Sequence, residues 1–513
     1  MSRRSSDRSG PFMPLSPLRL RLLVASLLTV SFLGALDHTV VSTSLATIAG
    51  DLGALEQMGW VVVSYTLAST VLLPVLGKLG DIVGPRAVFL SSLVLFLIAS
   101  LACGFAPNMG LLIVARVFQG MSSAGLQLMS QTIIAQVTSP RARPKYMAII
   151  GAAFPVAILI GPLLGGIIAD NWGWQWVFWV NLPVGVAALV FALVAIPSIP
   201  RASAPGFDVL GSVTFTAALV ALVLGVSWVA DPELLTPALS AFGIALAAFA
   251  LFFWAEVRAA NPVVPLHIFK NRTVAAGTAL SAIIGVGLFS ITAYLPTYVQ
   301  VAYSTTATVS GLVPIATVMG MLVSNLLTGF LASRSGRYRV YPIVGTALGA
   351  VGLLIMSMLP VGLPLWVPMV VMFAVGLGTG SFMSLIVAVV QSAAPKNATG
   401  AVTASVNIVR QVGSTVTTAI IGGVIGAGVA AMLPIGFDAA SLTPQLVHGS
   451  DAAFQATVAE IYRDVFAPIF IGLSAAYAVG FVAALLLPPG RLSNETGSIP
   501  VVAEPQNEPA SRA

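Results

Sequence analysis

Charge is scarce in this sequence. Only 8% of its 513 residues are Asp, Glu, Lys or Arg, whereas a soluble domain carries about 25%, so the chain is not built to cover a water-facing surface. Its single cysteine, Cys103, excludes an internal disulfide and is expected to be a small packing residue. Its three histidines, His38, His267 and His448, lie far apart in the chain and indicate no metal site. The sequence also lacks a G-x-x-x-x-G-K-[ST] phosphate loop, a G-x-S-x-G elbow and an H-E-x-x-H pair, which argues against an enzyme.

Long apolar runs are present instead. The chain is 58% hydrophobic, and apolar stretches recur from Leu22 to Leu487, each of roughly 20 residues, the length that one helix needs to cross the hydrocarbon. Continuous runs without period-two alternation exclude a membrane barrel, and a helix satisfies its own backbone in lipid. We therefore predict an all-α integral membrane protein. Its fourteen spans are expected at about 22–45, 57–77, 87–106, 110–136, 146–169, 176–197, 208–229, 237–255, 274–299, 308–332, 341–359, 365–389, 401–430 and 466–488.

The basic residues lie mainly on one side of this arrangement. Of the 23 lysines and arginines, Arg116 and Arg410 fall inside spans, Arg463 lies on one side and all the others lie on the opposite side. Basic loops remain in the cytoplasm, so we expect a multi-pass protein of the inner (plasma) membrane with both termini cytoplasmic. The net charge of +6 is spread over these loops, where it contacts membrane lipid, and no basic stripe indicates nucleic acid.

A repeated motif divides the chain. Residues 77–86 follow the second span and residues 329–337 follow the tenth, and both fit G-x-L-x-x-x-x-G with basic residues. If the two spans at about 207–272 are left out, six spans separate the two copies. This spacing indicates two repeated six-helix halves, as in many secondary transporters. We therefore divide the chain by residue range. The predicted parts are a cytoplasmic tail (1–21), a six-helix bundle (22–200), a two-helix insert with an inner linker (201–272), a second six-helix bundle (273–488) and a disordered cytoplasmic tail (489–513).

Asp37 is the acidic residue that falls deepest inside a predicted span. A carboxylate in hydrocarbon is expensive and therefore indicates function, because it can gain and lose a proton as its surroundings alternate between wet and dry. Arg116 is its expected partner, since both residues lie ~9 Å below the same membrane surface at 1.5 Å per residue. The alternative is a permanent structural ion pair.

Further polar residues lie inside spans of both halves. Those of the fourth span recur at three- and four-residue steps and so share one face, which either lines a cavity or packs against another helix. Arg410 either lines the same cavity or anchors its helix, and His38 either relays protons or packs through a hydrogen bond. We predict an apolar cavity with a few polar anchors, a combination that accepts varied hydrophobic ligands. The predicted cavity residues are Gln119, Ser123, Gln127, Tyr294, Asn325, Asn407 and Arg410.

Glycine and proline mark two segments that can move or pack closely. The fifth span contains residues at which a helix bends or approaches a neighbour; they are Pro155, Gly161, Pro162, Gly165 and Gly166. In the first copy of the repeat, an acid at a helix start beside basic residues is typical of a latch that holds the two halves in one state, although an ordinary solvated turn is the alternative. The latch residues are Gly77, Gly80, Asp81, Gly84 and Arg86.

Together these motifs resemble those of the fourteen-helix drug/proton antiporters of the major facilitator superfamily, over about residues 20–490. The matching segments are residues 36–41, the loop 77–86, Arg116 with Gln119 and Gly120, the glycines of the fifth span, and residues 174–185. The chain departs from the family pattern at Thr47, where proline is frequent, at Pro85, which replaces a basic residue, and at Ala157, where a further glycine is frequent. The tenth span has no acid, unlike some dication exporters, which argues against dication export.

The resemblance implies the major facilitator fold, with two six-helix bundles plus two insert helices, and a function. The function is export of hydrophobic or cationic drug-like compounds in exchange for protons, with Asp37 carrying the proton and Arg116 setting its proton affinity. It also implies a functional monomer that is driven by the proton gradient, without cofactor or metal. The alternatives are an exporter of one narrow endogenous substrate (a metabolite, lipid or amino acid) and a non-transporting sensor.

Overall fold

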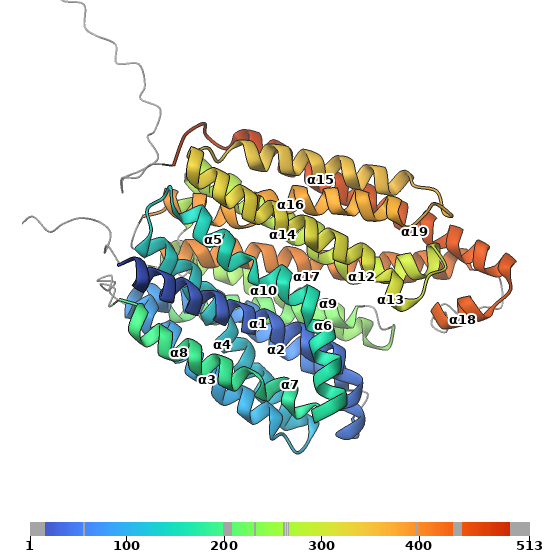
Figure 1. The fold of residues 1–513 in the computed structure, drawn as a ribbon, viewed down its shortest axis with the longest axis horizontal. Coiled ribbons are helices and arrows are strands. Elements are labelled where there is room, and N and C mark those ends of the chain that lie inside the picture. Colours follow the sequence, from blue (N-terminus) through green and yellow to red (C-terminus); the bar gives the residue numbers. More distant parts are fainter. Residues whose placement is uncertain are drawn as a thin grey trace, which may run out of the picture.

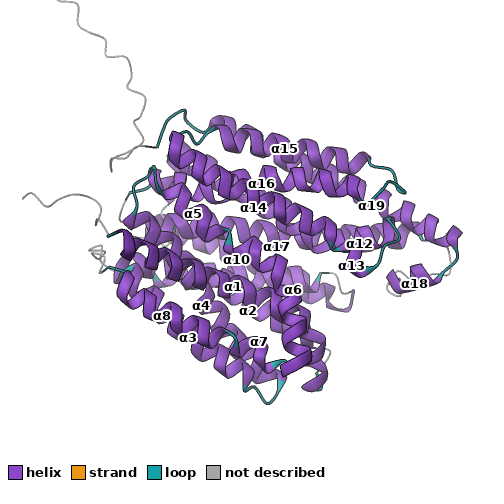
Figure 2. Cartoon of the chain, in the orientation of Figure 1, coloured by secondary structure: helices purple, strands orange, loops and turns teal. Residues whose placement is uncertain are grey.

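The computed structural model describes residues 16–54, 57–197, 208–229, 232–259, 262, 264, 266–395, 398–433 and 444–492. In this part of the chain the regular structure is helical, apart from one isolated bridge between Arg337 and Arg491 (Figure 2). The first and last described residues lie at the same end of the molecule (Figure 1), which we call the N/C end; the opposite end is the far end. The predicted segments 1–15, 198–207 and 493–513 lie outside the described residues.

The helices cross the molecule back and forth between these two ends. Within the described residues, thirteen helical segments are long and apolar enough to span a membrane, and α11, a π-helical turn and α12 make one further crossing. The N-terminal half comprises α1 (Pro17–Asp51), α2 (Met58–Val83), α3 (Pro85–Gly104), α4 (Met109–Val137), α5 (Arg143–Gly151), α6 (Ala153–Trp172), α7 (Gln175–Trp179) and α8 (Asn181–Ala195). The insert comprises α9 (Val209–Trp228) and α10 (Leu235–Arg258). The C-terminal half comprises α11 (Arg272–Ile284), the π-helical turn (Gly285–Phe289), α12 (Ser290–Ala302), α13 (Ala307–Ser310), α14 (Leu312–Ser335), α15 (Val340–Met358), α16 (Trp366–Ala393), α17 (Thr399–Met432), α18 (Pro444–Gly449) and α19 (Ala452–Leu486).

The predicted all-α membrane fold is confirmed, and most helix ends fall within a few residues of the predicted spans. The last span differs, because α19 begins at Ala452 rather than near residue 466. Large apolar side chains such as Leu246, Val257 and Met358 are about three-quarters exposed (75%, 74% and 75%). A surface of this kind suits hydrocarbon, in which each helix satisfies its own backbone.

The repeated glycines hold the two halves together at the N/C end. A Cβ at Gly77 of α2 would lie 2.9 Å from Ala404 Cβ of α17, and a Cβ at Gly329 of α14 would lie 2.3 Å from Ala148 Cβ of α5. Each copy of the repeat therefore lets a helix of one half cross close to a helix of the other. The two halves spread apart toward the far end (Figure 1).

Asp81 closes the N/C end through the start of α17. Its Oδ1 accepts a hydrogen bond from the Gly400 amide at 2.9 Å, and its Oδ2 accepts one from the Ala401 amide at 3.0 Å. The first amides of a helix lack partners within the helix and favour a negative charge, so this contact joins the halves. Arg86 of the predicted latch donates instead to the Leu193 carbonyl at 3.1 Å.

The second copy of the repeat makes a different contact between the halves. Arg141 donates to the carbonyl oxygens of Ser333 at 3.3 Å and of Arg334 at 2.8 Å. Farther from the loop on the same helix, Asn325 Nδ2 donates to the Ala148 carbonyl of the other half at 3.0 Å. The N/C end is therefore held shut by hydrogen bonds from both halves.

The predicted disordered tail, 489–513, includes residues 489–492, which the structure describes. The Leu492 amide donates to the Gly336 carbonyl at 2.8 Å, and the Tyr338 hydroxyl donates to the Pro488 carbonyl at 2.8 Å. Leu492 is buried, so its apolar side chain and these backbone bonds hold residues 489–492 against the loop between α14 and α15.

Replacing Asp81 with Asn should open the N/C end, because the amide group lacks the charge that the α17 N-terminus favours. A charged cap of this kind contributes about 1–2 kcal/mol, or about a 5- to 30-fold shift in the two populations. Spin labels on cysteines at Val83 and Ser335, the exposed ends of α2 and α14, report the opening as a longer distance. Cys103 is buried and should not label.

Asp451→Asn is the matched control. Asp451 Oδ1 caps α19 by accepting from the Phe454 amide at 2.7 Å, far from the N/C interface, so the label distances should stay as in the wild type. Unchanged distances in the Asp81→Asn variant would show that this contact does not hold the halves together.

Candidate functional site

Asp37 and Arg116 form an ion pair inside the N-terminal half. Asp37 lies on α1 and Arg116 on α4, and Arg116 Nη1 donates to Asp37 Oδ2 at 2.5 Å. Both side chains are fully buried. An isolated charge is strongly disfavoured away from water, so the two charges are tolerated here because they face each other.

Neutral side chains from three helices complete the surroundings of the carboxylate. Gln119 Nε2 donates to Asp37 Oδ1 at 2.7 Å, and Asn181 Nδ2 donates to the same oxygen at 3.1 Å. Ser100 Oγ in turn accepts from Gln119 at 2.9 Å. Both carboxylate oxygens therefore have donors. We call Asp37, Arg116, Gln119, Asn181 and Ser100 the ion-pair cluster.

The guanidinium of Arg116 rests against α2. Its Nε donates to the Val61 carbonyl at 3.1 Å, and its Cζ lies 4.2 Å from the centre of the Tyr65 ring and 5.9 Å from that of Phe178. Its Nη2 has no hydrogen-bond partner among the described residues. The faces of the Tyr65 and Phe178 rings partly make up for the hydrogen bond that Nη2 lacks, because a ring face attracts a cation.

Tyr65 separates the ion-pair cluster from a cavity. The Tyr65 side chain contacts Arg116 and also lines the cavity, and its hydroxyl lies 2.7 Å from Ser123 Oγ and 3.1 Å from the Gly34 carbonyl. His38 lines the same wall, with its ring centre 6.0 Å from that of Tyr65. The cluster is thus one side chain away from the cavity.

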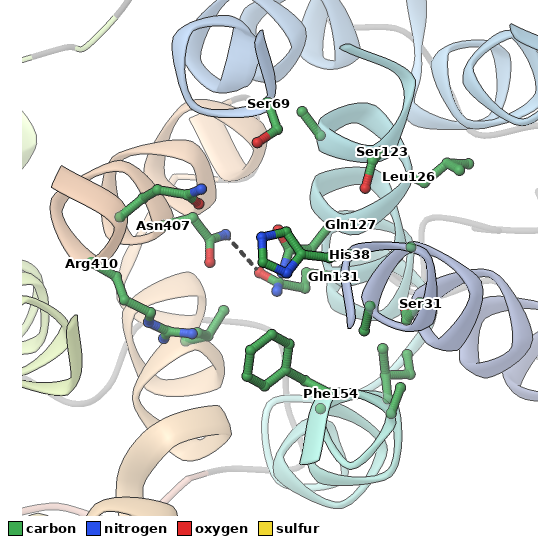
Figure 3. A pocket seen from close by; sticks show the side chains of 18 of the residues that line it. Ser31, His38, Ser69, Ser123, Leu126, Gln127, Gln131, Phe154, Asn407 and Arg410 are labelled. Atoms are coloured by element: carbon green, nitrogen blue, oxygen red, sulfur yellow. Dashed lines mark hydrogen bonds between the residues drawn. The ribbon is translucent and has the colours of Figure 1, made fainter. Parts of the chain in front are cut away.

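The cavity has a volume of about 390 Å³ and lies between the two halves. In Figure 3, Asn407 and Arg410 project from α17 toward His38, Gln127 and Gln131 of the other half. Asn407 Nδ2 donates to Gln131 Oε1 at 2.9 Å, and this bond crosses the cavity. Its described polar lining residues are Ser31, His38, Tyr65, Thr66, Ser69, Ser123, Gln127, Gln131, Ser384, Asn407, Arg410, Gln411, Ser414 and Thr415.

Of the predicted cavity residues, the structure places Ser123, Gln127, Asn407 and Arg410 in the lining. The other three are not among the described residues that line this cavity. Gln119 belongs to the ion-pair cluster, Asn325 donates to the Ala148 carbonyl of the other half, and the Tyr294 hydroxyl would lie 2.4 Å from a Cβ at Gly422. A polar residue inside a span can face a cavity, a neighbouring helix or a buried charge, and helical periodicity does not distinguish these.

The glycines of the fifth span pack α6 against α1, the helix that carries Asp37. A Cβ at Gly161 would lie 2.0 Å from Thr39 Oγ1, and a Cβ at Gly165 would lie 2.3 Å from Thr43 Oγ1. Only glycine permits this approach, so a shift of α1 must involve α6. The remaining motif positions on α6 are Pro155, which follows the break between α5 and α6, Pro162 and Gly166.

Ser100, Asn181 and Tyr65, at or beside the ion-pair cluster, were not singled out by sequence reasoning. Asn181 is a lone amide in an otherwise apolar span, which is the same signal that identified Asp37. Tyr65 carried a weaker sequence signal, because aromatic residues are common within spans. Its role depends on contacts with α1 and α4 that the sequence does not reveal.

Comparison with known proteins agrees with this architecture. Residues 27–418 match the family model described as Major Facilitator Superfamily. An MFS-type transporter of Mycobacterium tuberculosis (strain ATCC 25618 / H37Rv) is 32% identical over 489 residues, covering 93% of this chain and 70% of the relative. The multidrug transporter protein MdtP of Bacillus subtilis (strain 168) is 31% identical over 408 residues, covering 79% of this chain and 75% of the relative.

Two solved structures share the fold. The human organic anion transporter MFSD10 (TETRAN) superimposes with a TM-score of 0.60 at 15% identity, covering 91% of this chain and 100% of that chain. The proton:xylose symporter XylE superimposes with a TM-score of 0.59 at 14% identity, covering 94% of this chain and 98% of that chain. The chain belongs to the major facilitator superfamily and is a membrane transporter rather than an enzyme.

Proposed function

We propose that the protein exports hydrophobic, drug-like compounds in exchange for protons by alternating access. The observation that carries this proposal is the ion-pair cluster, which lies one side chain, Tyr65, away from a cavity between the two halves. A buried carboxylate that is dry in one conformation and reaches water in another can couple proton movement to transport. Relatives named a multidrug transporter protein and a multidrug resistance protein homolog support the choice of drug-like substrates.

The N/C end would face the cytoplasm. The loops at that end carry most of the basic residues, among them Lys78, Arg86, Arg141 and Lys145, and basic loops stay inside. The arrangement described above, shut at the N/C end, would then be outward-facing in the plasma membrane. When the protein changes to the inward-facing conformation, the hydrogen bonds between Asp81 and the first amides of α17 would break.

A proton on Asp37 would change the balance of the ion-pair cluster. The neutral acid no longer compensates the charge of Arg116, and an uncompensated buried charge costs several kcal/mol. The helices that carry the cluster must then shift until Arg116 reaches water or another acceptor. Because Gly161 and Gly165 pack α6 tightly on α1, such a shift would also move the wall of the cavity.

The cavity suits a compound of drug size. Its volume of about 390 Å³ falls within the usual range for such sites, about 300–1,000 Å³. Apolar walls with scattered amides and hydroxyls impose no single hydrogen-bond pattern, which permits varied ligands. Export of one endogenous compound is the alternative, and transport of several unrelated neutral dyes would contradict it.

Asp37→Asn should abolish proton-driven export. The substitution removes the titratable group and leaves Arg116 uncompensated, a change worth about 3–5 kcal/mol for a buried pair. We expect the rate of Nile red transport into or out of proteoliposomes under an imposed pH gradient to fall at least about tenfold. Asp464→Asn removes the carboxylate of an exposed ion pair and should leave the rate unchanged. Equal transport by Asp37→Asn and the wild type would remove Asp37 from the mechanism.

Arg116→Lys tests geometry separately from charge. Lysine keeps the positive charge but cannot reach Asp37, Gln119 and the Val61 carbonyl with one nitrogen, as the arginine fork does. Loss of one such charged hydrogen bond, about 1.5–3 kcal/mol, predicts at least about a tenfold slower rate in the same assay. Arg463→Lys, at the exposed pair, should change the rate by less than about twofold. Wild-type rates in Arg116→Lys would mean that charge alone suffices.

A further inference from the structure

The cavity contains a positive charge and no carboxylate among its described lining residues. Arg410 contributes the guanidinium, and the other ionisable groups of the lining are the His38 imidazole and the Tyr65 phenol. Asp37 lies nearby, but it is paired with Arg116 and does not line the cavity. A ligand in the cavity therefore meets a positive or neutral wall.

Neutral groups accept the hydrogen bonds of the Arg410 guanidinium. Its Nε donates to Ser281 Oγ at 3.2 Å, and its Nη2 donates to the Met383 carbonyl at 3.3 Å. The Ser281 hydroxyl gives its own proton to the Val406 carbonyl at 2.8 Å, so its lone pairs are free to face the guanidinium. Ion pairs between described residues join Arg116 to Asp37 and Arg463 to Asp464, and neither of them involves Arg410.

These contacts fix Arg410 without neutralising it. Charged side chains removed from bulk water are normally paired, and Arg410 is largely enclosed yet faces the cavity (Figure 3). The guanidinium presents planar donors that match the oxygen atoms of a carboxylate, sulfonate or phosphate. An anionic group on the ligand would supply the missing partner.

The rest of the lining suits an apolar body attached to that anionic group. Phe154 lies across the cavity from α17 (Figure 3), and Val30, Ile150, Met383 and Val387 also line the space. A cationic ligand of the same shape would meet Arg410 without a compensating carboxylate, and like charges placed together disfavour binding.

We propose that the cavity selects amphipathic organic anions, and that Arg410 is the residue that recognises the anionic group. This inference names the substrate class of the proposed exporter and revises the expectation of cationic compounds. Neutral hydrophobic compounds would bind more weakly than anions, and cations most weakly.

Binding of three dansyl probes to the purified full-length protein tests this order. Dansylglycine, dansylamide and N-(2-aminoethyl)dansylamide share one fluorophore and are anionic, neutral and cationic at neutral pH. We expect dansylglycine to bind at least about tenfold more tightly than the cationic probe, since hydrogen bonds to charged groups are among the strong ones. Equal or tighter binding of the cationic probe would overturn the proposal.

Variants then assign the preference to Arg410. Arg410→Gln should weaken dansylglycine about tenfold and leave dansylamide within about twofold, which also shows that the cavity is intact. Arg463→Gln removes the same charge from an exposed position and should leave the order unchanged. If Arg410→Gln does not fold, Arg410→Lys decides: anion binding weakened while the order is kept supports the assignment, and unaltered anion binding contradicts it.

The binding measurement needs no proton gradient. The binding order and the gradient-driven transport rate are therefore read separately on the wild-type protein. If the pH gradient does not drive transport but the three probes bind in the expected order, only the proposed antiport is refuted. Coupled transport with no preference for the anion would refute the substrate class alone.

Discussion

The pairing of two opposite charges in a dry interior governs the N-terminal half. Asp37 and Arg116 tolerate burial because each balances the other, and the surrounding helices supply the donors that complete the arrangement. Gln119 and Asn181 hold one carboxylate oxygen, and Tyr65 covers the guanidinium on the side of the cavity. In the proposed mechanism, neutralising the carboxyl group would require α1, α4 or α8 to move, which would link a proton to a conformation.

Helix α17 of the C-terminal half joins two further functional regions, the closed N/C end and the cavity. The first amides of α17 bind Asp81 and hold the N/C end shut, and the same helix carries Asn407 and Arg410 into the cavity. Nine residues (410 − 401) separate Ala401 from Arg410, which is ~14 Å along a helix. A ligand that shifts Arg410 would thus also shift the α17 amides that bind Asp81 and close the N/C end. If the ligand is an anion, its exit and the entry of a proton would move charge in the same sense, so an inside-negative potential would drive both.

The sequence was sufficient for the architecture, because fourteen apolar runs leave few alternatives in lipid. It also identified Asp37 with Arg116 from equal depth, and the repeated glycines at 77 and 329 proved to be the points where the halves cross. It did not reveal partners that depend on packing between distant segments. Asp81 binds backbone amides more than 300 residues away, and backbone groups carry no sequence signal. Asn325 looked like a cavity residue and instead donates to a carbonyl of the other half.

The central claim is that the Asp37 carboxyl gains and loses a proton within the ion-pair cluster. Infrared difference spectra of the purified protein test it most directly, because a protonated carboxylic acid has a carbonyl stretch that a carboxylate lacks. Comparing the wild type with Asp37→Asn isolates the signal of this one group. The account predicts a band that grows on acidification, is missing from the variant, and diminishes when a transported ligand is added. Identical spectra of the two proteins across the pH range would show that Asp37 stays ionised, and would contradict the mechanism.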